Sequence, residues 1–336
     1  MPAVSARRAR IRRDLLLALY PIGLIVILAT ISFARPRVGP AALILVFAPY
    51  FFVPALLLVP FVFRRGLVLL RISLLCAALC FPLIVPPALN GAPPDQAPPD
   101  LKVLSWNVYV GGVPTAQLTH VIETYRPDVL VLQEVDWRDL ETIPLIAETF
   151  PYQLMRPDEA APGLAILSRL PILESQVPAL GGESWDMPRV MWARIAAERP
   201  VYVVNAHPIP PRTFSNDCAL PSCYNRGPRD AQIRAISEYV AGLRSRGEPL
   251  LLVGDMNVND REEAYFDLAH NMIDVHRAVG LGFGHSWRPA FLHPLPALLR
   301  IDYMFAANGI QPRNFSTDCT WRGSDHCLIY GEFAIS

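Results

Sequence analysis

The stretch PLLLVGDMN, residues 249–257, is an apolar run that ends in a carboxylate and an amide. A short apolar run bounded by Pro and Gly predicts a strand that is buried in a sheet. Asp255 and Asn257 follow at the point where this strand stops. Because open α/β sheets bind their ligands beyond the ends of strands, the stretch predicts a buried sheet with a polar site at its edge.

Polar residues also stand at the ends of other apolar runs. They are Asn107 after VLSW, Glu134 after VLVLQ, His207 after VYVVNA, Asp302 near the start of IDYMF, and Asp325 with His326 before CLIYGEF. A single Asn or Asp at a strand end is more often a turn or cap residue, and Asp302 could simply pair with Arg300. Carboxylates are costly to bury without a partner. Their recurrence at so many strand ends therefore favours one shared site.

Residues 101–336 alternate strand-like and helix-like segments. Amphipathic helices are expected at 115–125, 136–150 and 229–246. Strands are expected in LKVLSWNVYV, DVLVLQEV, GLAILS, VMWARIAA, PVYVVNAH, PLLLVGDMN, RIDYMFAAN and DHCLIYGEF. This mixture of helical crossovers and strand hairpins predicts an α/β or α+β sandwich with a mixed sheet, and the length suits one domain.

Several of these segments together resemble a known protein family. The motifs LSWNV, LQEVD, GLAILSRLPI, VNAHP, VGDMNV, RIDYMF and GSDHCLIYGEF resemble, in this order, those of the endonuclease/exonuclease/phosphatase superfamily, which includes deoxyribonuclease I and the sphingomyelinases. The resemblance covers residues 101–336. It implies an α+β fold of the deoxyribonuclease I type, a four-layer αββα sandwich with its active site at one rim of two packed sheets. It also implies a phosphoester hydrolase that depends on Mg²⁺ or Mn²⁺.

The chemistry of phosphoester hydrolysis can be stated without the family. Phosphoryl oxygens are anionic and repel a nucleophile, so a catalyst must neutralise charge, orient a water molecule and help the leaving oxygen depart. Hard oxygen ligands of the kind found here suit Mg²⁺. By the resemblance, Glu134 is the principal metal ligand, with Asn107 and Asp325 close to the same ion. His326 receives the proton of the water or positions it, and Asp302 holds the other ring nitrogen.

The resemblance gives roles to the remaining polar residues as well. Asp255 orients the attacking water or assists the leaving group, Asn257 donates hydrogen bonds to the phosphoryl oxygens, and His207 stabilises the developing charge. Some members of the family carry a different residue at the position of His207. Arg229 and Gln232, at the start of the long helix expected at 229–246, are candidate phosphate ligands, the alternative being a solvated helix face.

The first hundred residues contain apolar runs at about 15–33, 41–63 and 66–87. Each comes close to the roughly 20 residues that a helix needs to cross a bilayer, so three transmembrane helices are predicted. Prolines interrupt the second run, and lipid-embedded helices tolerate them when neighbouring helices satisfy the freed carbonyls. The first run could instead be a signal peptide, but it is longer than a usual signal and two more runs follow.

Charge gives this anchor a direction. Residues 1–100 hold 10 Arg and 3 acids, for a net charge of +7, whereas residues 101–336 hold 19 Arg, one Lys and 27 acids, for a net charge of −7. Because cytoplasmic loops retain Arg, the clusters before the first and third runs place the N-terminus in the cytoplasm. Three crossings of the cell (inner) membrane then put the catalytic domain outside the cytoplasm. The Pro-rich stretch 86–100 is expected to form a semi-rigid spacer of at most about 45 Å, in which residues 88–100 are the linker between the anchor and the catalytic domain.

The substrate is less determined than the reaction. Binding to nucleic acid favours a positive surface, so the acidic domain disfavours a nuclease without excluding one, since a local Arg patch can override the net charge. A short tether to a membrane favours a phospholipid head group or a small phosphate ester. A third possibility is a membrane-held binding domain without catalysis. No obligate protein partner is inferred.

The cysteines offer two candidate disulfides. Cys218 and Cys223 could pair in an oxidising compartment, and the pairing of Cys319 with Cys327 is left open. Cys76 and Cys80 lie one turn apart in the third apolar run and are interpreted as packing residues.

Overall fold

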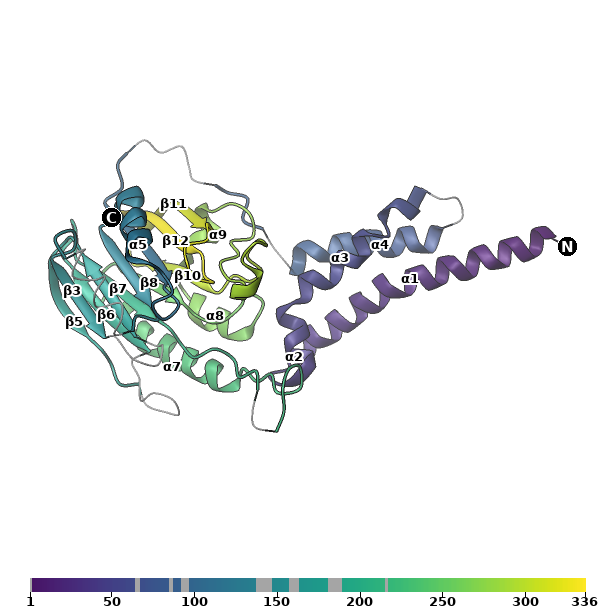
Figure 1. Ribbon diagram of the computed structural model, residues 1–336, viewed down its shortest axis with the longest axis horizontal. Helices are drawn as coiled ribbons and strands as arrows, with labels where there is room; N and C mark the ends of the chain where they lie inside the picture. The colour runs from purple at the N-terminus through teal and green to yellow at the C-terminus, as the bar shows by residue number, and fades with distance from the viewer. Residues whose placement is uncertain are drawn as a thin grey trace. The chain divides into compact units, whose positions relative to one another are not determined.

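A computed structural model of the chain describes residues 2–63, 67–84, 87–91, 97–136, 147–156, 163–180, 189–214 and 217–336. The chain divides into two compact units (Figure 1). The smaller unit contains residues 1–86 and 212–226, and the larger contains residues 87–211 and 227–336. Each unit has a hydrophobic core of its own.

The larger unit is built on two sheets, each with six strands among the described residues. The first sheet has the order β11-β12-β1-β2-β4-β3, formed by β11 (Ile310–Asp318), β12 (Leu328–Ile335), β1 (Leu101–Asn107), β2 (Val129–Gln133), β4 (Leu164–Ser168) and β3 (Tyr152–Arg156). The second has the order β5-β6-β7-β8-β10-β9, formed by β5 (Ile172–Gln176), β6 (Val190–Ile195), β7 (Val201–Ala206), β8 (Leu250–Asp255), β10 (Asp302–Ala307) and β9 (Ile273–Asp274).

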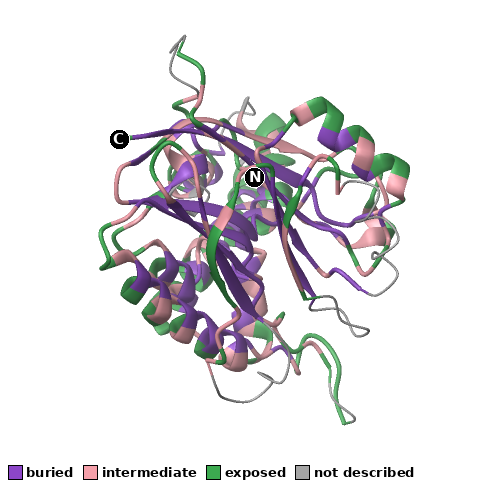
Figure 2. Ribbon diagram, turned by 90° about the vertical axis from the view of Figure 1, so that its left-hand side faces the viewer, coloured by how far each residue is buried: buried purple, intermediate pink, exposed green. Residues whose placement is uncertain are grey.

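Helices cover the outer faces of both sheets. Leu118, Val121 and Ile122 of α5 (Thr115–Tyr125) follow helical spacing and pack on the first sheet. Residues of α7 (Gly227–Arg244) and α8 (Glu263–Ala269) pack on the second. Between the sheets lies a core of Val, Leu, Ile and Met side chains. The strands in the middle of each sheet are accordingly buried (Figure 2), whereas the edge strands β3 and β5 are largely half-buried or exposed. The two-sheet α+β fold expected from the sequence is confirmed.

The strand register explains why polar ends meet. Strand β1 runs parallel to β2 and antiparallel to β12, and Asn107 stands opposite Gln133. In the second sheet β7 runs parallel to β8, and Asp255 at the end of β8 stands opposite Asp302 at the start of β10. The ends of β1, β2, β7 and β8 therefore lie at the same rim as the starts of β10 and β12.

The smaller unit is helical in its N-terminal part. It contains α1 (Pro2–Ala34), α2 (Gly39–Val46), the 3₁₀ helix η1 (Ala48–Phe52), α3 (Val53–Leu56), the 3₁₀ helix η2 (Val59–Phe63) and α4 (Val68–Ile84). Only α1 is long and apolar enough, among the described residues, to cross a membrane by itself. Such a helix fits either a membrane anchor or a signal sequence.

The three separate transmembrane helices that the sequence predicts are not found as such. The second apolar run is divided among four short helices, and its first half bends by 79° at a break. Pro49, Pro54 and Pro60 cause these breaks, since each lacks a backbone N–H and clashes with the preceding turn. The third run forms α4, whose 17 residues are fewer than expected for a full span. Residues 66, 85 and 86 of that run lie outside the described residues.

Other expected features can be placed as well. Disulfides join Cys218 to Cys223 and Cys319 to Cys327. Most of the helix expected at 136–150, and residues 92–96 of the expected spacer, lie outside the described residues. The beginning of the spacer is not extended into solvent, because Ala88 pairs with Gly282 of the larger unit through two backbone hydrogen bonds.

Candidate functional site

The polar residues predicted from strand ends gather at one rim of the two sheets. From the first sheet come Asn107 at the end of β1, Glu134 directly after β2, and Asp325 and His326 before β12; from the second come His207 after β7, Asp255 at the end of β8, Asn257 two residues later, and Asp302 at the start of β10. The sandwich thus joins residues that are more than 200 positions apart in the sequence.

Asn107 connects the two sheets at the centre of this site. Its Nδ2 donates to Glu134 Oε1 at 3.0 Å and to Asp255 Oδ2 at 3.0 Å. Its Oδ1 accepts from the backbone N–H of Tyr109. The side chain is completely buried. One amide therefore sets the separation of two carboxylates that would otherwise repel each other.

Asp255 lies between two histidines. Its Oδ2 is 3.5 Å from Nε2 of His207 and 3.6 Å from Nε2 of His326. Nδ1 of His326 lies 3.0 Å from Asp302 Oδ2, which also accepts a hydrogen bond of 2.6 Å from Ser286 Oγ. Because Asp302 occupies Nδ1, Nε2 of His326 faces Asp255.

Asp325 and Asn257 complete the group. Trp287 donates from Nε1 to Asp325 Oδ2 at 2.9 Å, whereas Asp325 Oδ1 is buried and has no hydrogen-bond partner. Asn257 donates from its backbone N–H to Asp255 Oδ1 at 2.9 Å and from Nδ2 to the carbonyl of Pro208. These contacts place Asn257 beside the carboxylate and beside the loop that follows His207.

The titratable groups of the site have pKa values that differ from their ordinary values in different directions. Burial alone would lower the pKa of His326, but the negative charges of Asp302 and Asp255 outweigh it and raise the pKa to about 10. Burial raises the pKa of Asp302 to about 6, against the positive charge of His326. Burial also acts to raise the pKa of Asp255, yet His326 and His207 together lower it. The surroundings therefore favour the ionised form of Asp255 and the protonated form of His326.

The side chains present fit a divalent cation. Ligand atoms of Glu134, His207 and Asp255 lie within 4.8 Å of one another, and so do those of Asp255, Asp302 and His326. Oδ1 of Asp325, which is buried without a hydrogen bond and lies 4.0 Å from Nε2 of His326, is a further oxygen that could bind a cation. Carboxylate oxygens predominate in this set, and such hard donors suit Mg²⁺ or Mn²⁺.

The backbone turns sharply at the strand ends that carry these side chains. Glu134 has φ of 57° and Asn257 has φ of 49°, in the left-handed region that few side chains adopt. Gly254 has φ of 139°, and a Cβ at this position would lie 2.2 Å from the carbonyl oxygen of Ala206. Only glycine therefore allows β7 and β8 to approach closely behind the site.

Arg229 and Gln232, the candidate phosphate ligands, are buried behind the rim. Arg229 donates from Nη1 to the carbonyl of Asn257 at 2.8 Å and forms an ion pair of 2.6 Å with Glu262. Gln232 Oε1 accepts from the backbone N–H of Ile209 at 2.8 Å. Neither residue forms a solvated helix face. These contacts hold the loop that carries Asn257 and the loop that follows His207.

Several residues that support the site could not be recognised from the sequence. Ser286 and Trp287 come from a loop that lies in no expected strand, and no local pattern marks them. A buried amide network, in which Gln133 Nε2 donates to Asn205 Oδ1 at 2.9 Å, links the sheets beneath Glu134. Asn205 could have been recognised from the sequence, since it is a polar residue within an apolar strand, two positions before His207.

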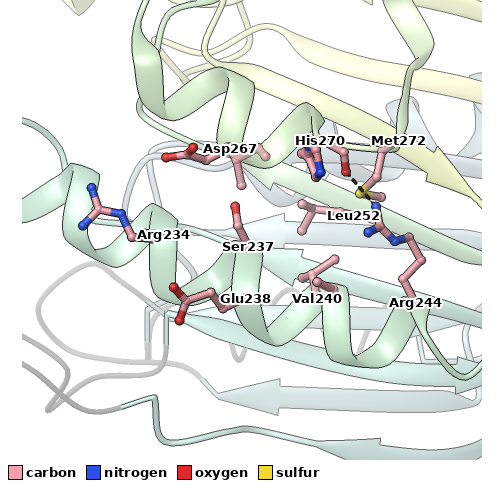
Figure 3. A pocket seen from close by; sticks show the side chains of 11 residues that line it. Arg234, Ser237, Glu238, Val240, Arg244, Leu252, Asp267, His270 and Met272 are labelled. Atoms are coloured by element: carbon pink, nitrogen blue, oxygen red, sulfur yellow. Dashed lines mark hydrogen bonds between the residues drawn. The ribbon is translucent and has the colours of Figure 1, made fainter.

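A cavity lies between α7 and α8 (Figure 3). It has a volume of about 280 Å³, and its lining includes Arg234, Ser237, Glu238, Leu252, Asp267, His270 and Met272. None of the polar residues at the strand ends lines it.

Comparisons with known proteins agree with the fold. The family model described as Endonuclease/Exonuclease/phosphatase family matches residues 104–326. The fold resembles a 3' phosphatase NExo from Neisseria bound to a product DNA hairpin, with 21% identity, a TM-score of 0.58, and coverage of 69% of this chain and 99% of that one. It also resembles a humanized D. rerio TDP2, with 21% identity, a TM-score of 0.55, and coverage of 69% and 98%.

A functionally unknown conserved protein from Enterococcus faecalis V583 is similar too, with 19% identity, a TM-score of 0.55, and coverage of 70% of this chain and 100% of that one. A search of curated protein sequences gives no match. At these identities the structural likeness shows the fold alone.

Proposed function

Because the chain belongs to the endonuclease/exonuclease/phosphatase family, we propose that it is a membrane-held phosphoesterase that uses a divalent cation. The observation that carries this proposal is the position of Asp255 between His207 and His326, next to the Asn107 bridge to Glu134. Two imidazoles and several carboxylates around one point suit an anionic substrate with a bound cation.

Glu134 is proposed as the principal ligand of Mg²⁺ or Mn²⁺, with Asn107 and Asp325 close to the same ion. When bound, the cation would neutralise charge on the phosphoryl oxygens. The free oxygen of Asp325 is held in place by the bond from Trp287 to the other oxygen, so this carboxylate is already oriented.

Asp255 is proposed to orient the attacking water and accept its proton. Its lowered pKa keeps it ionised at neutral pH. The raised pKa of His326 favours the positioning role over the base role that the resemblance also allows, because an imidazolium donates a hydrogen bond. Nε2 of His326, oriented by Asp302, would donate to a phosphoryl oxygen. Asn257 and His207 would add donors on the other side of Asp255.

The helices of the smaller unit are proposed as a membrane anchor with three crossings. Asp14 of α1 accepts hydrogen bonds from the backbone N–H groups of Leu69 and Leu70 at the start of α4. The start of the apolar part of α1 therefore lies at the same level as the start of α4. If both helices cross in the same direction, residues 35–67 must return across the bilayer. This topology places the larger unit outside the cytoplasm, and its disulfide agrees with an oxidising compartment.

The proposed substrate is a phospholipid head group or a small phosphate ester. A nuclease is the second candidate, favoured by the NExo structure, which is bound to a DNA hairpin. Residues 101–336 carry a net charge of −7, however, and this opposes the binding of a polyanion.

A direct assay tests the reaction. The full chain in detergent is incubated with a chromogenic phosphodiester in Mg²⁺, and then with a chelator. Glu134→Ala and His326→Ala should abolish turnover, as should the chelator, whereas Glu238→Ala on the exposed face of α7 should not. A panel of plasmid DNA, sphingomyelin, phosphatidyl lipids and inositol phosphates then identifies the substrate. Absence of wild-type turnover on every phosphoester would favour a binding domain without catalysis.

Topology is tested separately with reporter fusions after Ser336. An enzyme reporter that works only outside the cytoplasm should be active at this position. Activity of a cytoplasmic reporter there would instead overturn the proposed orientation.

A further inference from the structure

The chain enters the larger unit beside one particular loop. Ala88 donates to the carbonyl of Gly282 at 2.8 Å, and Gly282 donates back to Ala88 at 2.9 Å. Asn90 and Gly91 add hydrogen bonds to Arg277 and Gly280. Helix α4 ends at Ile84, four residues before Ala88. At about 3.5 Å per residue, the covalent chain keeps Ala88 within about 14 Å of the end of α4.

Large apolar side chains are exposed around this entry point. We call them the apolar rim: Leu89 (79% exposed), Leu281 (70%), Phe283 (41%), Phe291 (81%), Leu295 (52%) and Trp321 (40%). Contacts along the loop connect them. The ring of Phe283 stacks on His285, whose Nδ1 lies 3.2 Å from the carbonyl of Ala297, and the ring of His293 lies 4.6 Å from Trp321.

The same loop is bonded to the catalytic carboxylates. Ser286 donates to Asp302, and Trp287 donates to Asp325. The carbonyl of Ser286 also accepts from the backbone N–H of Cys327 at 2.7 Å, next to His326. Phe291 and Leu295 follow Trp287 by four and eight residues. The apolar rim therefore lies beside the proposed active site and belongs to the same bonded framework.

The charge of the loop differs from that of the domain around it. Residues 280–300 contain no Asp or Glu, although residues 101–336 as a whole hold 27 acids. Two Arg and two His are present in the same stretch. An acid-free loop with exposed Leu, Phe and Trp suits the head-group zone of a bilayer, where aromatic side chains are favoured and anionic lipids repel carboxylates.

We infer that the apolar rim docks on the phospholipid bilayer in which the chain is anchored, so that the site takes a phosphoester from a lipid head group. This inference rests on the proposed function for the reaction, and it names the surface that presents the substrate. The short link from α4 keeps the rim near the bilayer. Insertion of the rim would bring lipid head groups to the level of Asp325 and His326 without removing the lipid from the membrane.

Docking itself can be tested without any catalysis. The full chain is reconstituted into vesicles of phosphatidylcholine and phosphatidylglycerol, some with brominated acyl chains that quench tryptophan on contact. The difference between wild type and Trp321→Phe isolates the emission of Trp321 among the 6 tryptophans. Quenching of this difference signal supports docking. A Trp321 signal that brominated lipid leaves unchanged would overturn it.

The consequence for substrate is tested with a paired assay. Phe291→Ser/Leu295→Ser should lower turnover of vesicle lipid relative to a soluble phosphodiester by at least about tenfold, since two large apolar side chains leave the interface. The matched control is Leu173→Ser/Phe266→Ser, which removes side chains that are 51% and 59% exposed on β5 and α8. Equal ratios in both variants would contradict the inference.

The two hypotheses fail in different ways. A wild type that hydrolyses neither substrate refutes the proposed phosphoesterase, while the quenching experiment still decides whether the rim docks. A wild type that hydrolyses only soluble esters, with Trp321 unquenched, retains the enzyme and removes the membrane surface. Should the rim variant lose both activities through misfolding, the quenching of Trp321 in the intact chain again gives the answer.

Discussion

Asp302 binds both His326 and Ser286, although its carboxylate is almost completely buried. A buried acid of this kind costs free energy unless its partners compensate, and here they also orient the imidazole. The value of the residue therefore lies in the geometry it imposes on Nε2 of His326.

Replacement of Asp302 by Asn tests that role. The amide keeps the shape of the side chain but removes the charge that fixes the imidazole, so kcat should fall by about 10²-fold to 10⁴-fold. KM should change little, because Asp302 is too deeply buried to contact substrate. Steady-state kinetics on a soluble phosphodiester measure both constants, with Asp267→Asn at the separate cavity as control. An unchanged kcat would contradict the orienting role.

His276 is a buried histidine away from the site. Burial and the charge of Arg300 lower its pKa to about 4. The unfolded chain, with a pKa near 6.5, therefore takes up this proton first as the pH falls. Proton uptake by His276 in the unfolded chain therefore destabilises the fold at low pH. From this residue alone, the free energy of unfolding should fall by about 2 kcal/mol from pH 7 to pH 5.

Denaturation of the full chain at both pH values checks this expectation. His276→Gln keeps a donor for the carbonyl of Gly282 but does not titrate, so its loss of stability between pH 7 and pH 5 should be smaller than that of wild type. His120→Gln on α5, outside this buried group, is the control. If His276→Gln and wild type lose the same stability, the residue does not contribute to the pH dependence.

Helix α7 connects two loops of the site through its first turns. Arg229 bonds to Asn257 and Glu262, and Gln232 bonds to Ile209. Since the helix packs on the second sheet through Ile233 and Ile236, its position determines where both loops lie. Helix α7 therefore positions two loops of the site, although it contributes none of the polar residues at the strand ends.

The variant Arg229→Met distinguishes a structural role of Arg229 from a role in binding the phosphate of the substrate. Removal of the guanidinium leaves Glu262 and Asp230 without their buried cation, which should cost about 3–5 kcal/mol of stability. Thermal unfolding should show a clear loss, whereas Arg234→Met on the exposed side of α7 should stay within about 0.5 kcal/mol. A large fall in activity with unchanged thermal stability would show instead that Arg229 binds the substrate.

Across the whole molecule, cation binding should couple to stability. Glu134 and Asp255 are held close together, and their repulsion favours any state that separates them. A cation at about 100 times its Kd should add about 2.7 kcal/mol of stability. Mg²⁺ should therefore raise the unfolding temperature by several degrees, and a chelator should reverse it. Glu134→Ala should lose the shift and Glu238→Ala should keep it; equal shifts in both would place the cation elsewhere.

The apolar strands, their polar ends and the order of the motifs could be predicted because each depends on residues that are neighbours in the chain. Alternation and apolar runs report burial locally, and Asp255 or Asn107 stands out at a strand end without any knowledge of its partner. The α+β class followed from those local patterns, and the family from the resemblance of the motifs. The basic front and acidic back of the chain are likewise a matter of composition.

The contacts that complete the site could not be predicted, because they join segments that fold together from distant parts of the chain. Nothing local tells that Trp287 reaches Asp325, that Arg229 and Gln232 turn inward, or that Ala88 pairs with Gly282. The breaks in the second apolar run could not be predicted either, since hydropathy counts apolar residues but does not report where the helix bends. Packing between segments that are far apart in the sequence determines these features. The periodicity of the sequence reports only whether a residue is buried, and not which distant residue it contacts.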